Sequence, residues 1–140
     1  MKKLHYNIYS NITDRQFLKI EKKLLVLKYK MSKYLLQFGW QQLPEGDGLA
    51  IAFAKKNGVM RGSIGLVFDD HPNGITFTFD VMKCFDENND RFCLENNLFE
   101  QKELSFFENK IEEFTQLAFE KCNSWERDDI IALGEKIELG

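Results

Sequence analysis

Two rows of apolar residues recur at helical spacing, one near each end of the chain. The first row repeats every three or four residues and predicts a helix from Asp14 to Gln37. Its members are Phe17, Ile20, Leu24, Leu27, Met31, Tyr34 and Phe38. Thr13 and Gln16, three residues apart, have the pattern of a capping box that opens this helix. Further apolar residues widen the row and indicate packing on a sheet, with a coiled-coil seam as the alternative: Leu25, Val26, Leu35 and Leu36.

The second row predicts a helix from Phe106 to about Lys121, opened by a capping box of Ser105 and Glu108. Its apolar members are Phe107, Ile111, Phe114, Ala118 and Cys122. The tail from Ser124 to Leu133 has two interpretations. It forms either a short final helix or an extended strip that ends at Gly134.

Between the two rows, residues 48–82 alternate with period two, as expected for three strands of a meander. Asn57-Gly58 predicts a two-residue turn of type I′, and Pro72-Asn73-Gly74 predicts a second turn. In the third strand Thr76, Thr78 and Asp80 alternate with a large apolar set that we expect beneath the helices: Ile75, Phe77, Phe79 and Val81. The sheet therefore has one buried face and one face toward water.

Small residues recur on the second face of the first two strands. Leu49, Ile51 and Phe53 alternate with alanines, and Ile64, Leu66 and Phe68 alternate with the set Ser63, Gly65 and Val67. A solvent face of low side-chain volume is the commoner explanation. The alternative is that another backbone approaches closely around Ala52 and Gly65.

Shorter apolar stretches complete the predicted sheet. We expect short strands at Leu4–Ile8 and Phe38–Leu43, a loop at 44–48, and a hairpin in which Lys83–Phe85 turns at 86–90 into Arg91–Leu94. Residues 95–104 have no clear pattern. The predicted fold is a single α+β domain, residues 1–140, in which an antiparallel meander of about four to six strands carries the two helices on one face.

Charge is distributed unevenly along the 140 residues. Residues 1–40 contain nine Lys or Arg and two acidic residues, whereas the rest of the chain has an excess of ten acids, for a total of −3. One interpretation is a basic helix attracted to an acidic body. The other is a pair of oppositely charged faces, one of which steers a charged partner.

The compartment is predicted from what the sequence lacks. The first ten residues contain no apolar segment of a signal peptide, and no run reaches the ~18 apolar residues of a membrane helix. The three cysteines, Cys84, Cys93 and Cys122, form no close pair. Reduced thiols in the cytoplasm are the simplest interpretation, and a Cys84–Cys93 disulfide is the alternative.

Motifs for catalysis are sparse. The chain contains no phosphate-binding glycine loop, no His-Glu-x-x-His and no Cys-x-x-Cys. Asp69-Asp70-His71 is the nearest to a metal or acid–base site, but neighbouring strand residues point to opposite faces, which favours an ordinary hairpin loop. Cys93 and Cys122 stand among apolar residues, so burial is favoured over nucleophilic catalysis. We therefore predict no enzyme activity, cofactor or bound metal.

Nucleic-acid binding would use the basic first helix with Tyr29, Tyr34 and Trp40. The acidic balance of the remaining chain argues against it. The function is therefore expected in a surface, formed by acidic residues of the predicted loops and the tail: Glu45, Asp47, Asp69, Asp70, Asp86, Glu87, Asp90, Glu126, Asp128 and Asp129. Such a surface suits a basic protein partner.

In its size, missing motifs and acidic loops the chain resembles bacterial immunity proteins of contact-dependent-inhibition and polymorphic toxins. The resemblance implies a cytoplasmic, non-enzymatic inhibitor that neutralises a cognate, basic toxin domain of the nuclease type. Two alternatives stay open. One is a small metal-dependent or hydrolytic enzyme that uses Asp69, Asp70 and His71. The other is a cytosolic secretion chaperone. The oligomeric state is not predicted.

Overall fold

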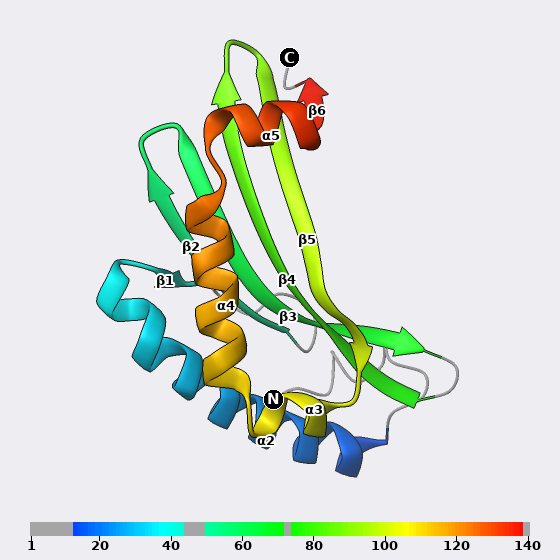
Figure 1. The fold of residues 1–140 in the computed structure, drawn as a ribbon. Helices are drawn as coiled ribbons and strands as arrows, with labels where there is room; N and C mark the ends of the chain where they lie inside the picture. Colours follow the sequence, from blue (N-terminus) through cyan, green and yellow to red (C-terminus); the bar gives the residue numbers. More distant parts are fainter. Residues whose placement is uncertain (1–12, 44–49, 72–73, 139–140) are drawn as a thin grey trace.

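The computed structural model describes residues 13–43, 50–71 and 74–138, and Figure 1 shows its α+β fold. In chain order the elements are α2 (Asp14–Leu35), the 3-10 turn η1 (Leu36–Phe38), β1 (Gln41–Gln42), β2 (Ala50–Asn57), β3 (Met60–His71), β4 (Gly74–Glu87), β5 (Asp90–Lys102), α3 (Leu104–Glu108), α4 (Ile111–Ser124), α5 (Arg127–Leu133) and β6 (Glu135–Glu138). The strand predicted at Leu4–Ile8 lies outside the described residues.

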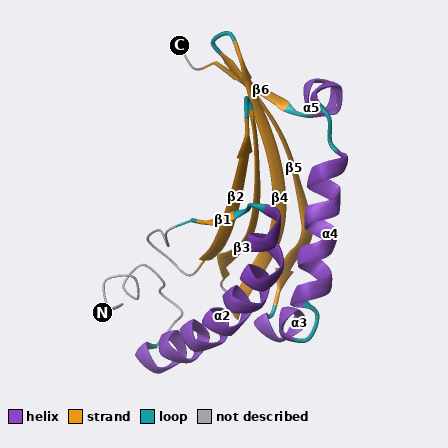
Figure 2. Cartoon of the chain, turned by 90° about the vertical axis from the view of Figure 1, so that its left-hand side faces the viewer, coloured by secondary structure: helices purple, strands orange, loops and turns teal. Residues whose placement is uncertain are grey.

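The sheet is an antiparallel meander in which each strand pairs with its neighbour in sequence, in the order β1-β2-β3-β4-β5-β6. This confirms the predicted fold class. The described helices pack on one face of the sheet (Figure 2). α4 lies over β3 and β4, α2 packs against α4 and β2, and α5 covers the far end of β4 and β5.

The large residues of the meander form the buried face, as predicted. They lie under the helices and are almost fully buried: Ile51, Phe53, Ile64, Leu66, Phe77, Phe79 and Val81. Each such side chain contributes about 1.5–3 kcal/mol by leaving water. Their neighbours Ala52, Ser63 and Thr78 occupy the opposite face, hereafter the open face, which none of the described helices covers.

α2 begins at the predicted capping box. The amide of Gln16 donates to Thr13 Oγ1 at 3.2 Å, and the amide of Thr13 donates to Gln16 Oε1 at 3.0 Å. The helix buries a narrower stripe than expected, comprising Phe17, Leu24, Leu27, Met31 and Leu35. The prediction that Leu25, Val26 and Leu36 would also pack on the sheet is wrong, since all three are exposed. Leu25 and Val26 lie on the arc of α2 that points away from β2 and α4, and Leu36 begins the 3-10 turn η1.

The predicted second helix is divided. A turn at Asn109–Lys110 separates α3 from α4, and α3 begins after Glu103 rather than at Ser105. The capping box of Ser105 and Glu108 is therefore wrong: Ser105 lies inside α3, and Glu108 pairs instead with Lys23 at 3.3 Å. The apolar row from Phe107 to Cys122 is buried nonetheless.

The tail forms a short helix, α5, which is the first of its two predicted forms. The chain then returns as β6, a strand that the sequence pattern does not indicate. β6 pairs with the first residues of β5, from Asp90 to Cys93. None of the described helices combines the length and the apolar character needed to span a membrane.

The first hairpin turns one residue later than predicted. Asn57 pairs with Met60, so the two loop residues are Gly58 and Val59. Gly58 has φ +63°, whereas neither Asn57 nor Val59 has a positive φ. Glycine alone at the first loop position is typical of a type II′ turn, not of the type I′ turn expected from Asn57-Gly58. Both types match the twist of the flanking strands, and glycine satisfies either.

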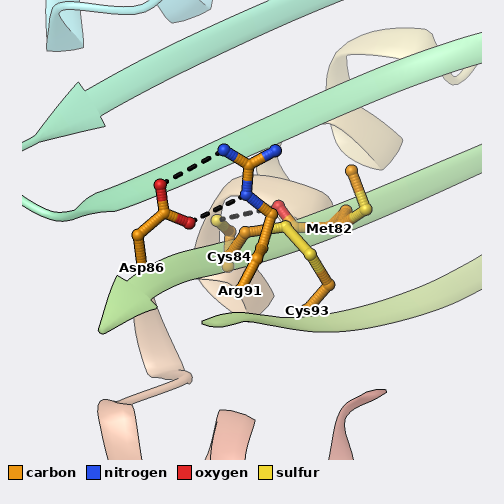
Figure 3. The surroundings of a disulfide bond; sticks show 6 residues. Met82, Cys84, Asp86, Arg91 and Cys93 are labelled. Carbon is orange, nitrogen blue, oxygen red and sulfur yellow. Dashed lines mark hydrogen bonds and ion pairs between the residues drawn. A yellow bond between two sulfur atoms is a disulfide. The ribbon is translucent and has the colours of Figure 1, made fainter. Parts of the chain in front are cut away.

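Cys84 and Cys93 are directly opposite in the register of β4 and β5 and form a disulfide. Figure 3 shows this bond between the strands, beside the ion pair of Asp86 and Arg91. The expectation of reduced thiols is wrong for this pair, because the register brings two side chains of one face together. Cys122 is free and buried, as expected.

Candidate functional site

An acidic hollow of about 570 Å³ lies on the open face of β3, β4 and β5. Its lining residues are Val67, Asp69, Thr78, Asp80, Asn97, Glu100 and Gln101. Glu95 adjoins it through its contact with Asp80. The term acidic hollow is used below for these eight residues.

Strand periodicity brings most of these side chains to one face. Thr78 and Asp80 are two residues apart on β4, and register pairs Thr78 with Val67 and Asp80 with Asn97. Beyond Asn97 the pairing of β5 is irregular, because extra β5 residues lie between the partners of Phe77, Phe79 and Asp80. Such bulges redirect side chains. Here Gln101 has φ +52°, and its amide donates to Thr78 Oγ1 at 3.2 Å instead of to a backbone carbonyl.

Asp80 is the most perturbed acid of the hollow. Burial, reinforced by a hydrogen bond and charge repulsion from Glu95, raises the pKa of Asp80 to about 7. Its cross-strand partner is Gly65, where a Cβ would meet Asp80 Oδ1 at 3.2 Å. The small residue that the sequence places here therefore makes room for the carboxyl group.

Asp69 and Glu100, the two remaining acids of the hollow, have neutral partners. Thr78 Oγ1 donates to Asp69 Oδ2 at 2.6 Å, and Asn97 Nδ2 donates to Glu100 Oε1 at 3.1 Å. Within residues 13–43, 50–71 and 74–138, no Lys or Arg forms an ion pair with Asp69, Asp80, Glu95 or Glu100. The hollow therefore gathers four carboxyl groups without a compensating cation from the described chain.

Four of the predicted partner-binding acids do have cations. Asp86 pairs with Arg91 at 2.8 Å, Glu87 pairs with Arg127, and Asp90 pairs with Lys136 at 3.4 Å. The hydrogen bond from Arg91 lowers the pKa of Asp86. The first turn of α5 uses Glu126 and Asp129 as a reciprocal cap, while Asp128 lies 3.7 Å from the guanidinium of Arg127.

The predicted acids also lie at two ends of the sheet. Asp69 is near the end of β3, and Asp86, Glu87 and Asp90 surround the turn at the other end of β4, where Arg127 joins α5 to them (Figure 1). Strands of this length separate the two ends by roughly 40 Å. Glu45 and Asp47 lie outside the described residues, as do the side chains of Asp70 and His71.

Of the residues in the acidic hollow, only Asp69 was among the partner-binding residues predicted from the sequence. Asp80 stands on the polar side of its strand and Gly65 on the small-residue side, so a signal was present for this pair. For Glu95 and Glu100 there was no such signal, because residues 95–104 have no clear sequence pattern. The register of β5 places Glu95 opposite Met82, and the bulges beyond Asn97 set the direction of Glu100.

Comparison with known proteins gives no relative: no protein-family model, no curated protein and no solved structure matches the chain. Among the described residues, no group of three or more His, Cys, Asp or Glu is arranged to hold a metal ion. Carboxyl groups such as the four of the hollow can form charge-assisted hydrogen bonds with a positively charged group.

Proposed function

We propose that this protein is a non-enzymatic inhibitor of the immunity-protein kind. In this proposal the acidic hollow binds a basic segment of a cognate nuclease-type toxin domain. The observation that supports it is the cluster of four carboxyl groups in which Asp80, half-buried beside Glu95, retains its proton up to about pH 7.

The electrostatics favour a cationic partner. Carboxyl groups held close together repel each other when charged, and Asp80 avoids part of this cost by staying protonated. An arginine or lysine brought into the hollow would remove the repulsion and form charge-assisted hydrogen bonds with the oxygens that remain free. Nucleases carry Lys and Arg where they hold phosphates, so their active surfaces present such groups.

The rest of the molecule has the charge distribution that would orient this encounter. α2 carries Arg15 and six lysines against two acids, and it packs against β2 and α4 on the helix side of the sheet. A basic partner is therefore repelled from the helix side and attracted to the hollow. Opposite charges on two faces increase the rate of association more than the final affinity.

A cytoplasmic location belongs to this proposal, and the disulfide of Cys84 and Cys93 bears on it. Disulfides persist in oxidising compartments and are rare in the cytosol. A cytoplasmic inhibitor would hold these two residues as thiols. The backbone pairing of β4 and β5 extends well beyond this pair. The hydrolytic-enzyme and secretion-chaperone hypotheses stay predictions.

The test uses the protein domain encoded beside the gene for this chain. We expect a basic toxin domain that forms a stoichiometric complex with the protein and loses its nuclease activity. The double substitution Asp80→Lys with Glu95→Lys should abolish binding. The matched control is Glu113→Lys with Glu120→Lys, which makes the same number of charge reversals at exposed positions of α4.

Two outcomes would contradict the proposal. One is a neighbouring domain that is not bound or not inhibited. The other is a complex that tolerates the double substitution in the hollow as well as it tolerates Glu113→Lys with Glu120→Lys, which would place the binding surface elsewhere. Circular dichroism and thermal unfolding of each variant distinguish loss of binding from loss of fold.

A further inference from the structure

A second pocket, of about 330 Å³, lies on the helix side of the sheet, where α4 ends and the β2–β3 hairpin extends past it. Its lining residues are Trp40, Lys55, Asn57, Met60, Gly62, Lys83, Cys122, Asn123, Trp125, Glu126 and Arg127. The acidic hollow is on the opposite face of the sheet, so the two sites are independent. The volume is within the range of small-molecule sites, roughly 300–1,000 Å³.

The inner wall of this pocket is rigid and apolar. Trp40 is almost fully buried, and its ring and the thiol of Cys122 both pack on Gly62. A Cβ at Gly62 would lie 2.7 Å from Cys122 Sγ and 3.1 Å from the Trp40 ring. Trp125, at the end of α4, adds a second indole to the lining. Flat aromatic walls of this kind favour a flat ligand.

Two ammonium groups converge on the same wall. Lys55 and Lys83 both lower the pKa of the Cys122 thiol, although burial outweighs them and raises it overall. Lys83 Nζ donates to the carbonyl oxygens of Cys122 at 3.0 Å and Trp125 at 2.7 Å. Because an ammonium has three N–H groups, one donor remains. The side-chain ammonium of Lys55 has no hydrogen-bonding or ion-pair partner among the described residues.

The only carboxylate that lines the pocket is already engaged. Glu126 accepts from the backbone of α5 in the cap of that helix. Arg127 is held by Glu87 and lies over the ring of Phe85, with its guanidinium carbon 5.4 Å from the ring centre. With Arg127 neutralised by Glu87, the lining carries the two positive charges of Lys55 and Lys83 against the one negative charge of Glu126. The pocket therefore keeps a net positive charge.

We propose that this pocket binds a small aromatic anion. The ring would pack on the indole walls, and a phosphate or carboxylate group would accept from Lys55 Nζ and from the remaining donor of Lys83. Aryl phosphates and aryl carboxylates both combine a flat ring with an anionic group. Separate titrations with one compound of each class distinguish them.

Intrinsic fluorescence provides a direct test, because Trp40 and Trp125 are the chain's two tryptophans and both line the pocket. Phenyl phosphate and benzoate are titrated separately into the full chain, with phenol and inorganic phosphate as probes of the ring and the anion alone. We expect a saturable change in tryptophan emission with at least one of the two aryl anions and weaker binding of phenol and inorganic phosphate.

The matched pair of variants is Lys55→Gln and Lys56→Gln. Lys55 lines the pocket, whereas its neighbour Lys56 projects from the other side of β2. Loss of a charged hydrogen bond should weaken binding roughly tenfold in Lys55→Gln and leave Lys56→Gln unchanged. The inference is overturned if neither aryl anion binds saturably, or if both variants lose the same affinity, which would indicate general charge attraction rather than a pocket.

Discussion

Asp80 and Glu95 hydrogen-bond through their side chains across β4 and β5, so that the two acids hold a proton between them near neutral pH. The register sets this contact. Asp80 is opposite Asn97, and Glu95 is opposite Met82, which makes the two acids diagonal neighbours on one face of the sheet. A close pair of like groups titrates as a unit, so its second proton leaves at a raised pH.

The first prediction concerns stability and pH. The pKa of Asp80 is raised in the folded protein from 3.8 to about 7, so the folded state binds more protons than the unfolded state between those values. Stability should therefore fall as the pH rises from about 4 to about 7. Asp80→Asn removes this dependence. At pH 8 it should stabilise the fold by about 1–2 kcal/mol, discounted for solvent screening.

Urea unfolding at several pH values measures this effect. Asp69→Asn is the control, because Asp69 lies in the same hollow but accepts its hydrogen bond from a neutral hydroxyl, that of Thr78. An unchanged pH profile in Asp80→Asn would contradict the assignment of the raised pKa to this residue.

A second prediction concerns the close contact at Gly62. Gly62→Ala should destabilise the protein by about 1–3 kcal/mol, because a Cβ has no room beside Cys122 Sγ and the Trp40 ring. Removing the sulfur in Gly62→Ala with Cys122→Ala should recover part of this loss. In a double-mutant cycle, the double variant should then lose less free energy of unfolding than the two single variants lose in total. Additive losses would show that the sulfur does not limit the space.

The third prediction concerns the contribution of the disulfide to stability. Cys84 and Cys93 are nine residues apart, and a link that closes so short a loop is worth about 2–3 kcal/mol. A reducing agent should lower the free energy of unfolding by that amount without disrupting the sheet, because the β4–β5 ladder continues beyond the pair. The same agent should have no effect on the Cys84→Ala with Cys93→Ala variant. A loss shared by that variant would show that the agent acts by some route other than reduction of this disulfide.

A fourth prediction concerns the end of α4. Lys83 Nζ binds two backbone carbonyls there, those of Cys122 and Trp125. Lys83→Met keeps an unbranched side chain one atom shorter but removes both bonds, which should cost about 1–3 kcal/mol. Backbone hydrogen exchange should rise in the last turn of α4. Lys56→Met is the control, and equal exchange in the two variants would rule out a capping role for Lys83.

The meander and the long helix follow from local patterns. Residues 75–81 alternate with period two, and the structure buries their apolar members as predicted. The cap of α2 at Thr13 and Gln16 is likewise a contact between residues three apart. Such features depend on neighbours in sequence, which is why the residues alone identify them.

The features that the sequence did not predict depend on contacts between residues far apart in the chain. The exposure of Leu25, Val26 and Leu36 reflects where α2 rests on β2 and α4, and helical spacing does not contain that information. β6 is four residues long and is a strand only because β5 offers it an edge. The division into α3 and α4 similarly follows packing rather than capping potential.

The alternation from Gly48 to Met82, the two amphipathic helices and the acidic balance were determined by the sequence itself, because each is a property of residues close together in the chain. The tertiary structure decided which acids are neutralised and which meet in the hollow. It paired Asp86 with Arg91 and Glu87 with Arg127, and it brought Glu95 to Asp80 and Cys93 to Cys84. Each of these pairs depends on strand register or helix docking, and a shift of one residue would turn the side chains to the other face.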